Sequence, residues 1–250
     1  MADYDLFAEK YKRVKETPFC IYSEEPTYLA SIGELEGKSV LDLACGEGHY
    51  TRKIKARGAA RVVGVDLSEG MIALARRQEG EEPLGIEYQV GDGARLGQVG
   101  TFDLVTASYL LNYAPDRAAL VGMCRAAHQS LKGGGRFVTL IANGDMDHEH
   151  YRPESRRLAK YGYDMDVVAQ SFPCKDGTPV TLHFYTDDPF SVTIYHHDGA
   201  TYKGALEEAG FKDVRSKPFS VTQEGMDAMP AGFWDDFLEI VPLVCVEAGK

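Results

Sequence analysis

Small and acidic residues follow three short apolar runs in the first half of the chain, and their types suit a ligand that contains adenosine. Gly46 and Gly48 lie in a turn after the first run, where the absence of a Cβ atom lets a ligand approach the backbone closely. Asp66 ends the second run, and a carboxylate there can accept hydrogen bonds from both hydroxyls of a ribose. Asp92 and Gly93 end the third run, where a carboxylate can accept from an adenine amine. In this order, the groups predict sites for a carboxylate or amine, a ribose and an adenine.

A dinucleotide-binding fold is the main competing interpretation, because it also places an acid about 20 residues after its glycines. Asp66 lies 20 residues after Gly46. A dinucleotide fingerprint needs Gly or Ala at position 51, however, where this chain has Thr51, and the bulky His49 and Tyr50 fill the turn. An NAD-dependent oxidoreductase is therefore the second hypothesis.

The elements that must position these residues alternate between strands and helices. Alternation at this interval predicts βαβ units with right-handed crossovers, so the carboxyl ends of the strands share one ligand-binding edge of a parallel sheet. The glycine run at 133–135 is predicted to be the turn out of the third helix. The predicted strands are 39–44, 61–66, 86–92, 102–108 and 135–142, and the predicted helices are 49–58, 68–80 and 116–135.

Residues 143–200 interrupt this alternation with a segment rich in aromatic residues, histidines and turn residues. An excursion of this length inside one domain is usually functional, and we expect it to cover the substrate. It is predicted to contain a strand pair at about 179–186 and 190–196. The remaining predictions are N-terminal helices at 4–16 and about 24–36, a helix at 200–209, and strands at 211–220 and about 239–247.

We expect a single domain over residues 1–250, because no repeat, linker or low-complexity segment divides the chain. Its predicted parts are an N-terminal helical lid (1–37), a ligand-binding core (38–142), the substrate-covering insertion (143–200) and the C-terminal part of the sheet (201–250).

The core resembles class I S-adenosylmethionine (SAM)-dependent methyltransferases over roughly residues 38–142. The resemblance implies an α/β, Rossmann-like fold with a mostly parallel seven-stranded sheet and helices on both faces. It also implies that the chain binds SAM and releases S-adenosylhomocysteine (SAH). The segments that carry it are VLDLACGEGHY (40–50), VVGVDLSEGMIALAR (62–76), VGDGARL (90–96), FDLVTASYLLNY (102–113) and LKGGGRFVTL (131–140).

The same resemblance implies a cofactor role for individual residues. Ala44 stands where the family often has its first glycine, which is a small departure. The implied set comprises the Asp42, Ala44, Gly46 and Gly48 turn for the methionine part, Asp66 for the ribose, Leu67 and Met71 beside the adenine, Asp92 and Gly93 at the adenine edge, Ser108 facing the methionine, and Tyr11 and Tyr22 closing over the cofactor.

A narrower resemblance links the chain to the methyltransferases of toxoflavin biosynthesis, which methylate ring nitrogens of an azapteridine. It implies methylation of a small molecule, with an azapteridine as one candidate acceptor. The segments that carry it are SYLLNYA (108–114), PFSVTIYHHDGATYKGALEEAGF (189–211) and PAGFWDDF (230–237).

The acceptor pocket is predicted at the carboxyl ends of the fourth and fifth strands, under the insertion and the N-terminal helix. Aromatic side chains there suit a flat heterocycle. Methyl transfer needs no metal, so we expect none, although His148 and His150 flank acidic residues. The candidate catalytic residues are Tyr109, His148, His150 and His196, and the candidate substrate-binding residues are Tyr109, Asn112, Tyr113, Asn143, Tyr185, Tyr195, His197 and Trp234.

Composition favours a small-molecule substrate. The formal net charge of −11 opposes binding to nucleic acid and to anionic membranes. The five cysteines include no C-x-x-C pair, and the N-terminus has no signal peptide, so we expect reduced thiols in a cytoplasmic monomer or homodimer.

These observations leave four functional hypotheses besides the oxidoreductase. The first is methylation of a ring or amine nitrogen of a heteroaromatic natural-product intermediate, and the second is O-methylation of a small molecule. The third is a SAM-binding module without catalysis. The fourth is a methyltransferase of RNA or protein, which the acidic charge and the lack of an added binding domain disfavour.

Overall fold

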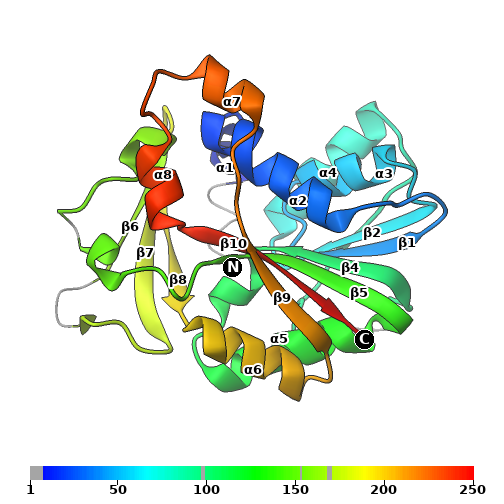
Figure 1. The fold of residues 1–250 in the computed structure, drawn as a ribbon. Coiled ribbons are helices and arrows are strands. Elements are labelled where there is room, and N and C mark those ends of the chain that lie inside the picture. Colours follow the sequence, from blue (N-terminus) through cyan, green and yellow to red (C-terminus); the bar gives the residue numbers. More distant parts are fainter. Residues whose placement is uncertain (1–7, 97–98, 153, 168–170) are drawn as a thin grey trace.

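A seven-stranded sheet forms the centre of the molecule (Figure 1), in the order β3-β2-β1-β4-β5-β10-β9. The computed structural model describes residues 8–96, 99–152, 154–167 and 171–250. Strands β1 to β5 pair in parallel, whereas β10 is antiparallel to both β5 and β9. The strands are β1 (Ser39–Leu43), β2 (Arg61–Asp66), β3 (Glu87–Val90), β4 (Phe102–Ser108), β5 (Leu131–Ala142), β9 (Lys212–Pro218) and β10 (Leu243–Gly249).

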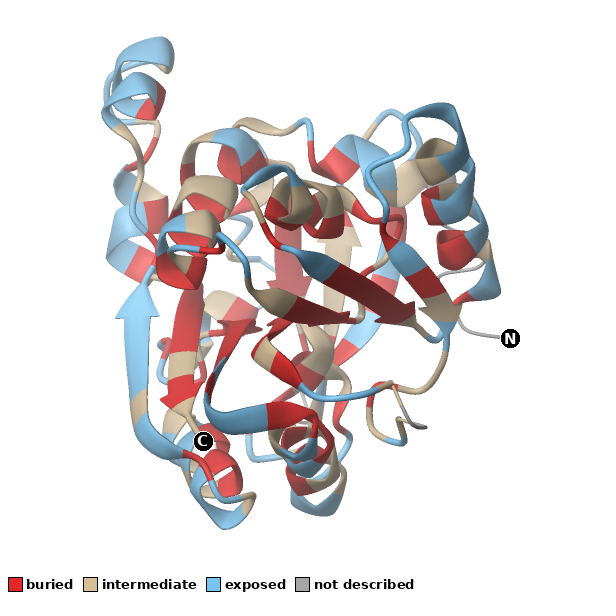
Figure 2. Ribbon diagram, turned by 90° about the vertical axis from the view of Figure 1, so that its right-hand side faces the viewer, coloured by how far each residue is buried: buried red, intermediate tan, exposed pale blue. Residues whose placement is uncertain are grey.

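Helices cover both faces of this sheet and enclose two hydrophobic cores (Figures 1 and 2). Side chains of a strand alternate between faces, so Val40 of β1 joins one core while Leu41 and Leu43 join the other. The predicted mostly parallel α/β fold is thereby confirmed. The first core is covered by α2 (Glu25–Ile32), α3 (His49–Ala56) and α4 (Glu69–Glu81), and the second by α5 (Arg117–Gln129) and α6 (Gly199–Glu208).

The predicted insertion contains a second, three-stranded antiparallel sheet in the order β6-β7-β8. The predicted strand pair is confirmed as β7 (Thr178–Phe184) and β8 (Phe190–His196), and β6 (Tyr163–Asp166) joins it without having been predicted. Alternate residues of β8 from Phe190 to His196 are buried, so one face of this small sheet turns inward. Two short 3-10 turns precede it, η4 (His148–Tyr151) and η5 (Ala159–Tyr161).

The N-terminal segment crosses the top of the sheet as α1 (Ala8–Val14), a π-helical turn η2 (Cys20–Glu24) and α2 (Figure 1). Residues 4–7 of the helix predicted at 4–16 lie outside the described residues, and the described part of that helix ends at Val14. The second predicted helix ends at Ile32 rather than residue 36, because Gly33 takes a left-handed conformation with φ +76°.

Two boundaries in the rest of the chain differ from the predictions. The glycine run at 133–135 is not a turn but part of β5, because a register shift between Phe102 and Leu104 of β4 accommodates the extra residues. The final strand begins at Leu243 rather than residue 239, because the helix α8 (Asp235–Ile240) occupies the preceding positions. A further helix, α7 (Gln223–Ala228), was not predicted.

In the part of the chain that the structure describes, every helix is too short or too polar to cross a lipid bilayer.

Candidate active site

Three of the five residues in the turn between β1 and α3 have left-handed backbone conformations. Ala44, Gly46 and Gly48 have φ angles of +54°, +57° and +92°. Glycine adopts this region freely, whereas an alanine there costs roughly 1–2 kcal/mol. A Cβ atom added to Gly46 would find only the Met71 sulfur, 4.0 Å away, so the space above the turn is open to a ligand.

Asp42 braces this turn from inside the protein. Its side chain is 1% exposed, and its oxygens accept hydrogen bonds from the hydroxyls of Thr51 (2.7 Å) and Thr106 (2.8 Å). Burial raises the pKa of the Asp42 carboxyl to about 6, although these two hydrogen bonds oppose the rise. The structure therefore gives Asp42 a bracing role, and direct contact with a cofactor remains a prediction.

Asp66 connects the end of β2 to the glycine turn. Its Oδ2 accepts a hydrogen bond from the Gly46 amide at 2.8 Å, and its Oδ1 accepts one from the Ser68 amide at 2.9 Å. Leu67 next to it is 60% exposed, whereas Met71 is buried beneath the turn. The carboxylate is held in position beside an uncovered apolar surface.

The ends of β3 and β4 complete this edge of the sheet. The Asp92 carboxylate accepts a hydrogen bond from the Ala94 amide at 2.8 Å, which fixes its orientation after β3. A Cβ atom added to Gly93 would lie 3.3 Å from Leu110, so the backbone passes close to the turn after β4. The hydroxyl of Ser108 is buried without a hydrogen-bond partner among the described residues. Because β3, β2, β1 and β4 are neighbours in the sheet, the structure brings the predicted cofactor residues after β1–β4 to one edge.

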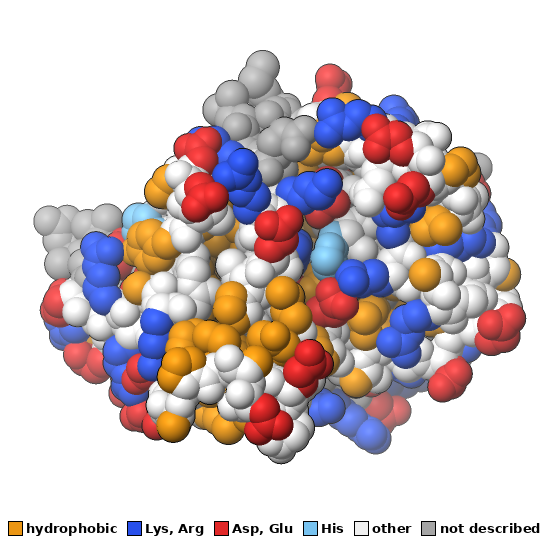
Figure 3. Space-filling model, turned by 90° about the horizontal axis from the view of Figure 1, so that it is seen from above, with side chains coloured by type: hydrophobic (Ala, Val, Ile, Leu, Met, Phe, Trp, Pro, Cys, Tyr) orange, Lys and Arg blue, Asp and Glu red, His pale blue; other side chains and the backbone are white. Residues whose placement is uncertain are grey.

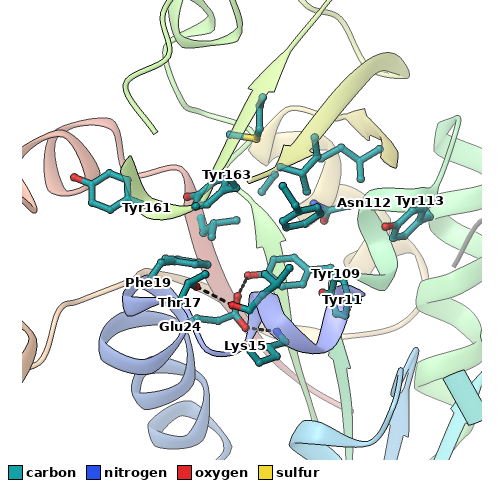
Figure 4. A pocket seen from close by; sticks show the side chains of 18 residues that line it. Tyr11, Lys15, Thr17, Phe19, Glu24, Tyr109, Asn112, Tyr113, Tyr161 and Tyr163 are labelled. Atoms are coloured by element: carbon teal, nitrogen blue, oxygen red, sulfur yellow. Dashed lines mark hydrogen bonds and ion pairs between the residues drawn. The ribbon is translucent and has the colours of Figure 1, made fainter. Parts of the chain in front are cut away.

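A largely apolar cavity adjoins this edge (Figure 4). It lies at the ends of β4 and β5, between the N-terminal segment and the small sheet, and about 650 Å³ of space lies between its lining atoms when the solvent-open mouth is counted. This is the predicted position of the acceptor pocket. Predicted residues in its wall are Tyr11, Tyr109, Asn112 and Tyr113, and further wall residues include Lys15, Phe19, Glu24, Tyr161, Tyr163, Met165, Leu182, Phe184 and Ile194.

A buried ion pair closes one end of this cavity. The Lys15 ammonium donates to the Glu24 carboxylate at 2.5 Å, and the two residues are only 9% and 2% exposed. The hydroxyls of Tyr109 (2.5 Å) and Tyr50 also donate to Glu24. Lys15 Nζ lies 4.7 to 5.8 Å from the ring centres of Tyr11, Tyr50 and Tyr109, which form an aromatic cage around the cation.

The charges of this pair persist at neutral pH. Burial alone would raise the pKa of the Glu24 carboxyl, but the Lys15 ammonium and the three hydrogen bonds outweigh it and hold this pKa below its usual value. Burial alone would lower the pKa of Lys15, but Glu24 outweighs it and raises this pKa. The cavity therefore contains a neutralised pair rather than a bare charge.

Tyr109 is held in a strained backbone conformation directly after β4, with φ +68°. Such strain in a bulky residue persists only where the surrounding structure fixes it, and it is concentrated at functional sites. Burial and the neighbouring Glu24 carboxylate raise the Tyr109 pKa well above its usual value. The side chain therefore stays protonated and acts as a hydrogen-bond donor and as a wall of the cavity.

Two polar atoms in the cavity wall lack hydrogen-bond partners among the described residues. These are Oδ1 of Asn112 and the hydroxyl of Tyr163, and both residues are at least nine-tenths buried. A buried polar atom without a partner costs roughly 1–3 kcal/mol, so a ligand that satisfies it gains affinity.

Several predicted residues lie away from the cavity wall. Tyr22 packs against Gly225 of α7, and the Trp234 indole stacks on Tyr161 and donates to the Gly225 carbonyl at 2.8 Å. The Asn143 amide donates to the Val241 carbonyl at 2.8 Å, and Tyr185 is 38% exposed. Their roles at the site remain predictions.

The predicted histidines gather elsewhere in the insertion. His148 and His196 face each other with ring centres 4.8 Å apart, and His150 follows on the same short turn. His197 lies within hydrogen-bond distance (2.9 Å) of the Ala114 carbonyl. Tyr195 lies with His196 and His197 around a second, smaller hollow. Of the four predicted catalytic residues, only Tyr109 lines the main cavity.

Lys15 and Glu24 were not predicted as site residues. They lie nine residues apart on either side of an irregular turn, so no helical or strand period brings them together. The two acids in SEEPTY (23–28) give no local signal of which one is buried; the structure buries Glu24 and leaves Glu25 partly exposed.

Comparison with known proteins supports the core of this site. A family profile described as "Methyltransferase domain" matches residues 40–135, which include the glycine turn, Asp66, Asp92 and Tyr109. A ubiquinone biosynthesis O-methyltransferase of Nitrosococcus oceani is 37% identical over 117 residues, which are 45% of this chain and 48% of that protein. The chain thus spans about half the length of the curated relatives that it matches.

Solved structures resemble the whole fold. A SAM-dependent methyltransferase of Mesorhizobium loti superposes with a TM-score of 0.65 at 24% identity, over 95% of this chain and 100% of that one. Another from Clostridium acetobutylicum has a TM-score of 0.66 at 16% identity, over 98% of both chains. These likenesses confirm the fold.

Proposed function

We propose that the chain is a SAM-dependent methyltransferase that modifies a small molecule. The observation that carries the proposal is one sheet edge, where the glycine turn, Asp66 and Asp92 follow three neighbouring strands and adjoin a largely apolar cavity. The match of residues 40–135 to a methyltransferase domain supports it.

The residues of this edge fit SAM. Gly46 leaves open space for the methionine part, and Asp66 is positioned for the ribose hydroxyls. Leu67 offers its exposed side chain to the adenine, while Asp92 reads the adenine edge. The hydroxyl of Ser108, which has no hydrogen-bond partner in the described part of the chain, is available to a polar group of the methionine part. When bound, SAM supplies a methyl group on a sulfonium, which is a good leaving group.

The remaining contribution of the chain is positioning and exclusion of water. The N-terminal segment and the small sheet enclose the acceptor, and the Lys15–Glu24 pair fixes Tyr109 at the boundary between the cofactor edge and the cavity. Tyr109 stays protonated, so it orients the acceptor rather than removing its proton. A neutral nitrogen acceptor suits this site, because its lone pair attacks before any proton must leave.

The acceptor is proposed to be a ring or amine nitrogen of a heteroaromatic natural-product intermediate, with an azapteridine as the first compound to test. Aromatic walls suit a flat ring, and Asn112 and Tyr163 offer hydrogen bonds to polar atoms at its edge. O-methylation is the second candidate, which the name of the Nitrosococcus oceani relative favours. Acidic and basic side chains are interspersed over the face seen in Figure 3, which supports a small substrate rather than nucleic acid.

Calorimetric titration with SAH, followed by transfer of labelled methyl from SAM to a demethylated azapteridine, tests the proposal. We expect the natural chain to bind SAH, Asp66→Ala to lose most of this affinity, and Glu82→Ala, which removes a largely exposed carboxylate, to retain it. Binding without transfer would direct the search to other amines, phenols and heterocycles. Saturable NAD binding without SAH binding would replace the proposal with the oxidoreductase.

A further inference from the structure

A side chain from the start of the insertion meets two side chains from its end at one end of the small sheet. His148 lies in η4, His196 ends β8, and Asp198 directly precedes α6. One nitrogen or oxygen atom from each lies within 4.8 Å of the others. His196 Nε2 and Asp198 Oδ1 are 3.1 Å apart, and the two imidazole rings stand nearly perpendicular, at 81°.

The surrounding structure orients these groups toward one another. The His196 side chain is 1% exposed, and its second nitrogen, Nδ1, lies 3.5 Å from the hydroxyl of Tyr151. Asp198 stands at the N-cap of α6 but makes no side-chain cap hydrogen bond, and its carboxylate faces His196 instead. Within the described ranges, neither imidazole nitrogen of His148 has a hydrogen-bond partner. The nitrogens of His148 are therefore free of hydrogen bonds to the described part of the protein and lie beside the His196–Asp198 pair.

We propose that His148, His196 and Asp198 bind one divalent transition-metal ion of the Zn²⁺ type. Two imidazoles and one carboxylate are a ligand set that Zn²⁺ takes, with water in the fourth position, whereas Mg²⁺ and Ca²⁺ prefer oxygen ligands alone. The hydroxyl of Tyr151 acts as the outer partner that fixes the orientation of the His196 ring.

The geometry needs only a small adjustment. Ligand atoms of a tetrahedral zinc site lie about 3.4 Å apart, given bonds of about 2.0–2.2 Å. The His196–Asp198 distance of 3.1 Å already fits. His148 must move inward by up to about 1.4 Å, and its ring, which is not fully buried, must shift within its contacts with Tyr151 and Phe172.

The ion would connect three elements beside the acceptor cavity. Ile194 lies two residues before His196 on the same face of β8, and it lines both the main cavity and the smaller hollow beside His196. Bound metal therefore fastens η4 and the start of α6 to the strand that forms the cavity wall.

Calorimetric titration with ZnCl₂ tests the site on the full chain, freed of any histidine tag, stripped with EDTA and kept reduced. We expect one ion per chain, with the affinity lost in His148→Ala and Asp198→Asn and retained in His150→Ala, which removes the neighbouring histidine of the same turn. Tyr151→Phe is expected to weaken binding about tenfold. SAH titrations and circular dichroism of each variant show whether the fold is intact.

Cobalt substitution distinguishes metal binding at this site from metal binding by the five cysteines, all of which are buried. Co²⁺ bound by imidazole and carboxylate gives visible d–d bands without the near-ultraviolet charge-transfer band of a thiolate. No saturable Zn²⁺ binding, binding that persists in both His148→Ala and Asp198→Asn, or a thiolate band would each overturn the proposal.

Discussion

Replacing either member of the Lys15–Glu24 pair alone is expected to destabilise the protein far more than replacing both. Lys15→Met leaves the carboxylate of Glu24, which is 2% exposed, without its counter-ion. Glu24→Gln leaves the buried Lys15 ammonium facing a neutral amide. Removing one partner of such a pair costs about 3–5 kcal/mol, because the remaining charge stays desolvated.

The double variant avoids this penalty. In Lys15→Met/Glu24→Gln, methionine fills the space of the lysine stem, and the glutamine carbonyl still accepts from Tyr50 or Tyr109. We expect it to cost less than about 2 kcal/mol, so the coupling between the two sites exceeds about 4 kcal/mol.

Urea unfolding at pH 7 measures these differences. With a slope of about 3 kcal/mol per molar urea, each single variant lowers the midpoint by more than about 1 M. Lys10→Met is the control, because the Lys10–Asp188 pair has a similar distance (2.8 Å) but side chains that are 30% and 60% exposed. Its loss should stay below about 1 kcal/mol. The reasoning would be refuted if the single variants at Lys15 and Glu24 also lost less than about 1 kcal/mol, or if their losses simply added in the double variant.

Three further predictions concern the cofactor edge. Ala44→Gly relieves about 1–2 kcal/mol of strain at φ +54°, whereas the greater freedom of glycine in the unfolded chain costs about 0.5–1 kcal/mol. The substitution should therefore raise the free energy of unfolding by up to about 1.5 kcal/mol, and a loss above about 1 kcal/mol in urea unfolding would contradict this. The Asp42 pKa is raised from 3.8 to about 6, so the folded chain binds the Asp42 proton more tightly than the unfolded chain does. The stability that this proton contributes is complete below about pH 4 and is lost as the pH rises through 6. Asp42→Asn should therefore gain up to about 3 kcal/mol relative to the natural chain between pH 4 and pH 7, and a pH-independent difference would exclude the effect. Ser68→Ala removes the N-cap bond to the Met71 amide (3.0 Å) and should cost about 1 kcal/mol at the thermal midpoint, whereas Ser68→Thr should retain most of it.

The parallel half of the sheet was predictable because its strands are mostly short apolar runs, and β1, β2 and β3 end at or close to glycines and acids. Local sequence determines such a run, and the carboxyl edge follows from right-handed crossovers. The register shift that draws Gly133–Gly135 into β5 depends on the neighbouring strand β4, which no local pattern records. Similarly, β6 is polar in sequence (YDMD) and is a strand only because it pairs with β7.

The site residues likewise fall into a group that local sequence reveals and a group that it does not. Glycines and acids at strand ends act through backbone geometry, and their spacing along the chain reveals them. Lys15 with Glu24, and His148 with His196 and Asp198, are brought together by irregular turns and by packing across 9 to 50 residues of sequence. The individual residues of the cofactor-binding edge could therefore be predicted from the sequence. For the acceptor cavity, the sequence indicated only the kinds of residue to expect.

The antiparallel strand β10 constrains the order in which this protein can fold during synthesis. It follows every other strand along the chain, yet it pairs with β5 on one side and β9 on the other, and β9 has no other neighbour in the sheet. On the ribosome, β1 to β5 can pair as they emerge, but β9 must wait as an unpaired, largely exposed strand (Figure 2) until β10 leaves the exit tunnel. The exposed charges of Lys212, Arg215 and Lys217 on β9 oppose pairing with other chains during that interval.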